Sequence, residues 1–138
     1  MIELIFRFLS LLAKFNIVET PIKIVHKGAF PSFNDIYESK HWTTRYNLTQ
    51  KYHKLFAILI KEAAVPKIEK FSLLLTFNSR HDVDNIIAME KFFTDTLVKC
   101  GCIAKDNTKV FKALHIIHDN KLEMNEIDFY IIPHKQHD

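Results

Sequence analysis

The fold is decided by residues 69–117, which read EKFSLLLTFNSRHDVDNIIAMEKFFTDTLVKCGCIAKDNTKVFKALHII. The almost wholly apolar run at 69–77 predicts a buried strand. Residues 84–100 place apolar side chains at helical spacing, and Gly101 is well positioned to end that helix. Residues 108–117 predict a second strand. A strand, a helix and a strand in this order form a βαβ unit, so we expect the two strands to be parallel.

Segments on both sides of this unit complete the expected domain. Residues 21–28 alternate apolar and polar side chains, which predicts a strand, and residues 48–64 predict a helix that Pro66 ends. Residues 29–47 are rich in turn-forming side chains and predict a loop. A last strand over IDFYII, residues 127–132, is expected to pair with the strand before it as an antiparallel hairpin.

Together these elements predict an α+β domain with a mixed sheet of about four strands and two helices that cover one face. Residues 1–15, MIELIFRFLSLLAKF, have apolar side chains at helical spacing and are too short to span a bilayer. We interpret them as an amphipathic helix. The chain is therefore divided into an N-terminal helical extension at 1–18 and a single domain at 19–138.

Composition narrows the class of protein. A chain of 138 residues with a formal charge of +3 fits one globular domain and permits nucleic-acid binding without requiring it. Cys100 and Cys102 are too close in sequence for ordinary disulfide geometry, and no further ligands stand at zinc spacing. We therefore expect two free thiols, a cytoplasmic location and no membrane partner.

Three aspartates are candidates for a metal site. Asp82 and Asp84 follow a buried strand, and residues i and i+2 of an extended strand end point to the same side. Asp106 precedes the next strand, and whether it reaches the other two depends on the path of the loop. Carboxylate oxygens suit Mg²⁺ or Mn²⁺, which can activate water to attack a phosphodiester. Alternatively the acids cap the following helix, a role that Asp84 before Asn85 fits.

A wider pattern surrounds these acids. It consists of DVDN at 82–85, Lys91, DTL at 95–97, Gly101, Ile103 and Asp106. This ordered set resembles the RusA family of Holliday junction resolvases, whose members carry DxDN, a helical Lys four residues before Asp-x-Leu, a Gly and a pair of acids. The segment PSFNDIYESKHW at 31–42 also looks like the opening loop of that family. The resemblance extends from about Ile22 to Ile132.

The resemblance implies both chemistry and partners. Asp82, Asp84 and Asp106 correspond to the magnesium ligands of the family, where Mn²⁺ may substitute. Lys91 corresponds to its active-site lysine, which steadies phosphate charge in the transition state. We interpret Asp95 as part of the helix structure or as a partner of Lys91 rather than as a ligand. The family's proteins are homodimers, which matches the two-fold symmetry of a four-way DNA junction, and they are common in prophages.

The chain departs from the family pattern in three places. Lys105 stands where the family usually has the first of two adjacent acids, which places metal affinity and activity in doubt. The helix between DxDN and the lysine is one turn longer than in the shortest version of the pattern. Residues 1–15 have no counterpart in it.

Cations and aromatic side chains alternate in the expected loop before the second helix. Lys40, His41, Trp42 and Arg45 are our candidates for DNA binding, because Lys and Arg suit phosphates and Trp can stack on exposed bases. The alternative for Trp42 is that it anchors the loop on the helix at 48–64.

The sequence therefore predicts a homodimeric, Mg²⁺-dependent endonuclease that resolves Holliday junctions in DNA recombination and repair by metal-activated hydrolysis of phosphodiesters. Three alternatives stay open. One is a protein that binds branched DNA and has lost catalysis, as Lys105 suggests. Another is a structural or interaction protein whose acids are helix caps. The third is a nuclease of the same fold that acts on a different substrate, such as DNA flaps.

Overall fold

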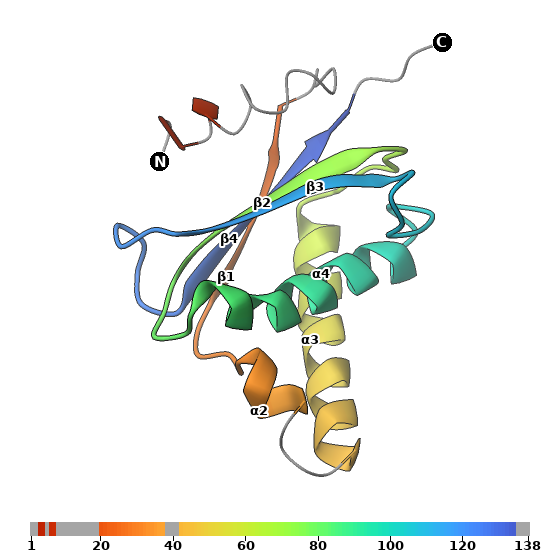
Figure 1. Cartoon of the computed structure of the whole chain (residues 1–138). Coiled ribbons are helices and arrows are strands. Elements are labelled where there is room, and N and C mark those ends of the chain that lie inside the picture. Colours follow the sequence, from red (N-terminus) through yellow and green to blue (C-terminus); the bar gives the residue numbers. More distant parts are fainter. Residues whose placement is uncertain (1–2, 5, 8–19, 38–41, 135–138) are drawn as a thin grey trace.

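The computed structural model describes residues 3–4, 6–7, 20–37 and 42–134. Residues 20–37 and 42–134 form a sheet with α3 and α4 on one side (Figure 1). Its elements are β1 (Ile22–Lys27), α2 (Phe33–Tyr37), α3 (Trp42–Glu62), β2 (Phe71–Asn78), the 3-10 turn η2 (Val83–Ile86), α4 (Ile87–Lys99), β3 (Phe111–His118) and β4 (Glu126–Pro133). The predicted α+β class and mixed four-stranded sheet are confirmed. The predicted helix at 1–15 and the boundary at residue 18 lie almost entirely outside the described residues.

The sheet has the strand order β1-β4-β2-β3. β2 and β3 are parallel, as the βαβ pattern predicts, while β4 is antiparallel to both β1 and β2. The predicted hairpin between the last two strands is therefore wrong. The physical reason is burial, because every residue of β4 is buried and no residue of β3 is. The more apolar strand takes the centre of the sheet and leaves β3 at an edge.

The connection at 119–125 crosses the end of β2, so that β4 lies on the opposite side of β2 from β3. The amide of Asp119 donates to the carbonyl of Phe77 at 2.8 Å, and the amide of Asn125 donates to the carbonyl of Asn78 at 2.6 Å. The side-chain amide of Asn78 donates to the carbonyl of Leu122 at 2.8 Å. These bonds satisfy backbone groups that a two-strand hairpin would otherwise have paired.

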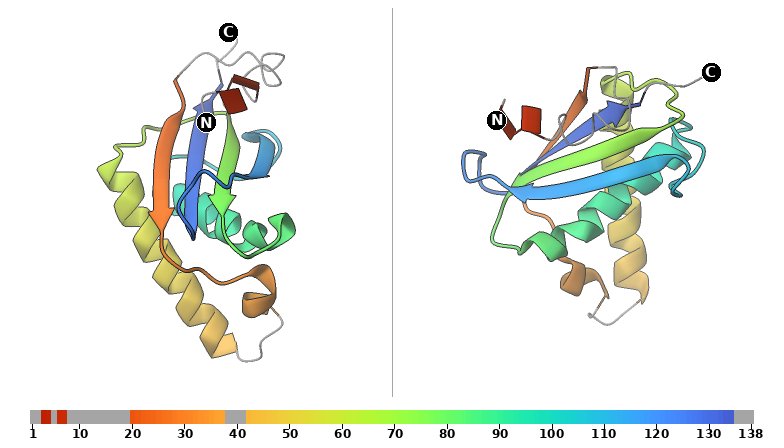
Figure 2. Two further views of the ribbon diagram at one scale, coloured as in Figure 1. Left: turned by 90° about the vertical axis from the view of Figure 1, so that its left-hand side faces the viewer. Right: turned by 45° about the horizontal axis from the view of Figure 1, so that its top comes forward.

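Both long helices lie on the same side of the sheet, as predicted (Figure 2). Phe56 of α3, Phe93 of α4 and Phe129 of β4 meet there, with ring centroids 4.2 to 5.4 Å apart. All three side chains are fully buried. Aromatic rings at these separations bury large apolar areas, so this contact fixes how the two helices cross the sheet. None of the described helices combines the length and the apolar character that crossing a membrane requires.

Residues of β2 and β4 that alternate with the core side chains point to the opposite side of the sheet. They include buried polar groups, namely Ser72, Thr76, Asp128 and Tyr130. Asp128 pairs with Thr76 in register, and its carboxylate lies 3.5 Å from the ammonium of Lys23. Polar side chains this deeply buried on a strand interrupt its apolar pattern without removing it from the centre of the sheet.

The expected loop at 29–47 is only partly a loop. It contains the short helix α2, and α3 begins at Trp42, six residues earlier than predicted. Between Trp42 and Glu62 the chain has no Gly or Pro, so nothing stops the helix from extending toward its N-terminus. The hydroxyl of Thr49, within the predicted helix, donates to the carbonyl of Arg45 in this added part at 2.8 Å.

Candidate functional site

The turn after β2 presents the two aspartates of the DVDN motif to solvent. Asp82 is the N-cap residue of η2, with φ −71° and ψ 159°, but its side chain forms no capping hydrogen bond. Asp82 and Asp84 are both exposed, and neither carboxylate contacts a partner in the described part of the chain. The alternative that these acids serve as caps therefore finds no bond to support it, and both carboxylates are free to accept a cation or a donor.

A histidine fixes the position of this turn. His81 donates from Nε2 to the carbonyl of Phe30 at 3.0 Å, and the two rings lie 5.2 Å apart. The hydroxyl of Ser79 accepts from the amide of His81 at 3.1 Å. These contacts tie the end of β2 to the segment that follows β1, so the aspartates stand on an anchored turn rather than on a free loop.

Asp106 reaches α4 because the chain reverses direction after that helix. Gly101 has φ +76°, a left-handed conformation that glycine adopts without strain, and the amide of Cys102 bonds the carbonyl of Leu97 at 2.9 Å. Ile103 is buried and holds the returning chain against the core. The prediction that Gly101 ends the helix is confirmed. Cys100 and Cys102 are both free thiols, as expected.

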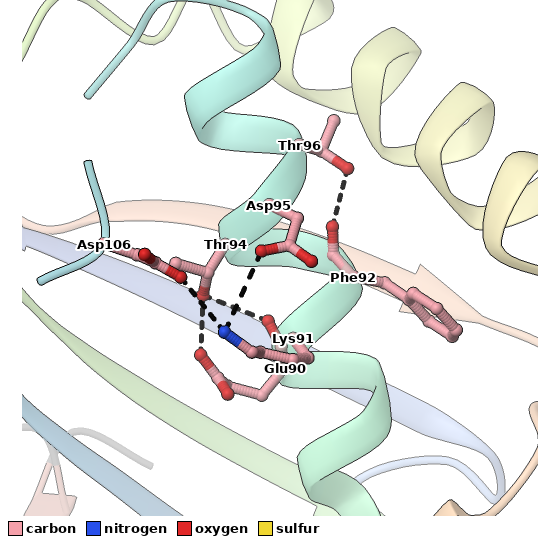
Figure 3. Close-up of polar contacts among 7 residues, drawn as sticks. All are labelled: Glu90, Lys91, Phe92, Thr94, Asp95, Thr96 and Asp106. Atoms are coloured by element: carbon pink, nitrogen blue, oxygen red, sulfur yellow. Dashed lines mark hydrogen bonds and ion pairs between the residues drawn. The ribbon is translucent and has the colours of Figure 1, made fainter. Parts of the chain in front are cut away.

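The returning loop brings Asp106 to Lys91 (Figure 3). Nζ of Lys91 donates to Oδ2 of Asp106 at 3.1 Å and lies 4.0 Å from Oδ1 of Asp95. The hydrogen bond that Lys91 donates to Asp106 is the main reason that the pKa of Lys91 is raised. The predicted contact of Lys91 with Asp95 is therefore present, and Asp106 is a second partner.

A buried carboxyl group adjoins this cluster. Glu90 is 5% exposed, and Oε1 accepts a hydrogen bond from the hydroxyl of Thr94 at 2.6 Å. Burial raises the pKa of Glu90, and the charges of Asp95 and Asp106 raise it further, while the Thr94 hydrogen bond and the charge of Lys91 lower it. Sequence reasoning missed Glu90, because its place next to Lys91 on a helix is that of an ordinary surface residue. The only signal was a carboxylate inside an otherwise apolar helix face.

The predicted site residues thus fall into two groups. Lys91 and Asp106 are in contact, and Asp82 and Asp84 stand together on the turn before α4. Among the described residues, no three His, Cys, Asp or Glu side chains gather as closely as a bound metal ion requires. The first turn after Asp82 is 3-10 rather than α-helical, so Asp84 and Lys91, seven residues apart, are not separated by two regular α-helical turns.

A cleft of about 560 Å³ opens beside Asp106. Its walls come from α3, from the last turns of α4 and from the returning loop, and its polar lining residues are His53, Asp95, Lys99, Lys105, Asp106 and Asn107. Lys105, which stands where the resembled family has an acid, lines this cleft. The cluster around Lys91 therefore borders a cavity large enough for a ligand.

The candidate DNA-binding residues that the structure describes lie on a helix and not in a loop. Trp42 and Arg45 occupy the first two turns of α3, and Trp42 is 67% exposed. The alternative that Trp42 anchors a loop is therefore wrong. Lys40 and His41 lie outside the described residues. Tyr46, one helical turn from Trp42, is 57% exposed and adds a second aromatic side chain that the predicted set did not include.

Comparison with known proteins adds no assignment. No protein-family model matches the chain, and a search of curated proteins finds no significant match.

Proposed function

We propose that this protein is a homodimeric, Mg²⁺-dependent endonuclease that cuts branched DNA, with four-way junctions as its substrate. The observation that carries the proposal is the contact of Lys91 with Asp106 across 15 residues of sequence. The resemblance implies that these two residues share a site, and their contact supports the proposal. The carboxylates of Asp82 and Asp84, which have no partner in the described part of the chain, supply further acidic groups on the turn before α4.

The donor set fits a hard divalent cation. Carboxylate oxygens are the ligands that Mg²⁺ prefers. Asp82 and Asp84 would hold the ion, and Asp106, which pairs with Lys91 in a separate group, would have to move toward them to join as a third ligand. When bound, such an ion lowers the pKa of a water molecule and stabilises charge on the phosphate. The protein's own contribution is to anchor the turn at His81, to keep the DVDN carboxylates free of caps and to hold Lys91 in its charged form.

Lys91 has a defined task in this proposal. Its ammonium group has three N–H donors, and Asp106 accepts one of them. The remaining donors can bind a phosphate oxygen and steady the negative charge that develops there. Asp106 and Asp95 keep the pKa of Lys91 raised, so the side chain stays protonated at neutral pH.

The first turns of α3 would contact the DNA. Trp42 and Tyr46 expose aromatic rings, and Arg45 lies between them in the sequence. The part of α3 from Trp42 to Lys54 carries Arg45, Lys51 and Lys54 and no acidic residue. A basic helix with exposed aromatic side chains suits phosphates and unstacked bases.

A second candidate is a protein that binds branched DNA without cutting it. It is favoured by Lys105 in place of an acid and by the ion pair that occupies Asp106. Under this alternative the Lys91 cluster is a structural ion pair and binding relies on α3 alone.

The test uses a labelled four-way junction and a linear duplex of the same sequence, each with Mg²⁺ or with EDTA. The wild-type protein is compared with Asp84→Asn and with the matched control Glu62→Gln, which alters an exposed acid remote from the turn. We expect paired nicks in the junction only, lost in EDTA and in Asp84→Asn and kept in the control. Junction binding without any nick, in Mg²⁺ as in EDTA, would favour the second candidate.

A further inference from the structure

The side chain of His53 forms an unusual contact in the cleft beside Asp106. His53 lies in the middle of α3, is 9% exposed, and stands edge-on to Phe92 with ring centroids 6.1 Å apart. The ammonium nitrogen of Lys99 lies 2.8 Å from Nδ1 of this ring. A lysine that ends a helix normally points into solvent, so a bond to a buried imidazole calls for an explanation.

The chemistry of the two groups determines which of them donates the hydrogen bond. A lysine ammonium has donors only, so Nδ1 of His53 accepts, and the neutral ring carries its proton on Nε2. Burial, followed by the charge of Lys99, lowers the pKa of His53, which keeps the ring neutral. Nε2 is buried and has no hydrogen-bond partner among the described residues. The ring thus leaves one donor unpaired while it holds Lys99 in place, and a buried group left unpaired in this way often marks a functional constraint.

The ammonium group of Lys99, which His53 holds in place, forms no ion pair with a carboxylate among the described residues. Within the described part of the chain, neither Lys99 nor Lys105 lies within 4.0 Å of a carboxylate. Asp95 and Asp106 also line the cleft, and the ammonium of Lys91 offsets one of their two negative charges. With Lys99 and Lys105 the cleft therefore keeps an excess of one positive charge, and the amide of Asn107 adds a neutral donor.

We propose that this cleft binds a phosphate group, with Lys99 and Lys105 as its ligands and His53 as the residue that positions Lys99. Lys99 keeps two N–H donors beyond the one that His53 accepts, which suits two oxygens of one phosphate. The volume of about 560 Å³ leaves room for the sugars on both sides of a phosphodiester. That the phosphate belongs to a DNA strand entering the Lys91 site rests on the proposed function. Binding of phosphate itself does not.

The experiment follows the His53 ring by nuclear magnetic resonance while inorganic phosphate, a nucleoside monophosphate or a linear duplex is added in EDTA. Variants Lys99→Gln and Lys105→Gln change exposed side chains and leave the core intact. Lys99→Arg is the conservative variant, and Lys61→Gln is the control on α3. His53→Gln reports on positioning, and its folding is checked by circular dichroism.

We expect inorganic phosphate to shift the His53 signals saturably in the wild type and in Lys61→Gln, and to leave them unmoved in Lys99→Gln. Loss of one phosphate contact should weaken duplex binding on the order of tenfold and lower the salt slope of log K by about 0.9. Lys99→Arg should restore most of the phosphate response and most of the duplex binding. His53→Gln lacks the reporter ring, so it is compared by duplex binding alone, which should lie between that of Lys99→Gln and that of Lys99→Arg.

The inference is overturned if phosphate leaves the His53 signals unchanged, or if Lys99→Gln and Lys61→Gln bind alike. Saturation by the nucleotide with no response to DNA would overturn the DNA strand as the source of the phosphate. Because all measurements use EDTA and binding alone, a junction that is never cut would refute the proposed endonuclease while leaving the phosphate site standing.

Discussion

Nζ of Lys91 lies 3.1 Å from Oδ2 of Asp106, although the two residues are 15 positions apart and belong to a helix and to the loop that returns along it. The side chains are 53% and 37% exposed, so solvent screens the pair and its contribution to stability is small. A precise contact that adds little stability is better explained by what it does for the charge and position of the lysine.

Replacement of Lys91 or Asp106 should separate activity from stability. We expect Lys91→Gln to change the free energy of unfolding by less than about 1 kcal/mol, as is usual for exposed ion pairs. Junction cleavage should fall by about 100-fold or more, because the donor to the phosphate is gone. Urea unfolding and a nicking assay measure the two effects. A large loss of stability with unchanged cleavage would make the pair structural.

The aspartates of the DVDN turn should behave as ligands and not as caps. Loss of a true N-cap side chain costs about 1 kcal/mol, but Asp82 forms no capping bond. Asp82→Asn should therefore leave the unfolding midpoint almost unchanged without metal. In the wild type, Mg²⁺ should raise the midpoint, because a ligand that binds only the folded state stabilises it. This Mg²⁺ effect should vanish in Asp82→Asn, and a midpoint that ignores Mg²⁺ in both proteins would refute the metal site.

The exposed start of α3 should contribute to binding alone. Trp42→Ala removes a ring that is 67% exposed, so we expect little change in unfolding. Stacking on a base is worth about 1–3 kcal/mol, so binding to a junction should weaken about five-fold or more. Fluorescence anisotropy with a labelled junction measures this loss. Ile58→Ala, which truncates an exposed side chain elsewhere on the same helix, serves as the control and should bind as the wild type does.

The βαβ unit was predictable because local patterns decide it. The apolar run of β2, the helical spacing of α4 and Gly101 at its end each specify one local conformation, and the connection rule then makes β2 and β3 parallel. The position of β4 was not predictable in this way. A short connection suggests a hairpin, and only the complete burial of β4 in the assembled sheet places it between β1 and β2.

In the candidate site, too, local sequence patterns predict some features and only the assembled fold determines the others. Asp82 and Asp84 on the turn after β2 follow from the chain order, whereas the contact of Asp106 with Lys91 depends on a loop path that no local pattern encodes. His53 and Lys99 were missed for a related reason. They are 46 residues apart on two helices, and each reads as an ordinary polar residue within its own helix.

Replacement of Thr76 by an apolar side chain of similar shape should stabilise the folded protein. It is fully buried in β2, and its hydroxyl has no hydrogen-bond partner among the described residues. Valine has nearly the same shape and no polar atom to desolvate. We expect Thr76→Val to raise the free energy of unfolding by about 1 kcal/mol in urea denaturation. The matched change Thr96→Val, which removes a hydroxyl bonded to the carbonyl of Phe92 at 2.6 Å, should show no such gain.

Asp128 should make stability depend on pH. Burial, then the neighbouring Glu126, raises the pKa of Asp128 to about 6, against the opposing charge of Lys23. Since the unfolded value is about 4, the folded state binds the proton more tightly between those two values. The stabilisation is therefore complete below about pH 4 and is lost as the pH rises through 6.

The variant Asp128→Asn tests this directly, because the amide cannot ionise. Its stability should be close to that of the wild type at pH 4 and should exceed it at pH 8, with the gap opening between those values. Urea unfolding across this range measures the gap. Lys23→Met provides the converse, because removal of the opposing charge should move the decline to higher pH and deepen it. Parallel curves for wild type and Asp128→Asn at every pH would contradict the assignment, since the buried carboxyl would then have an ordinary pKa.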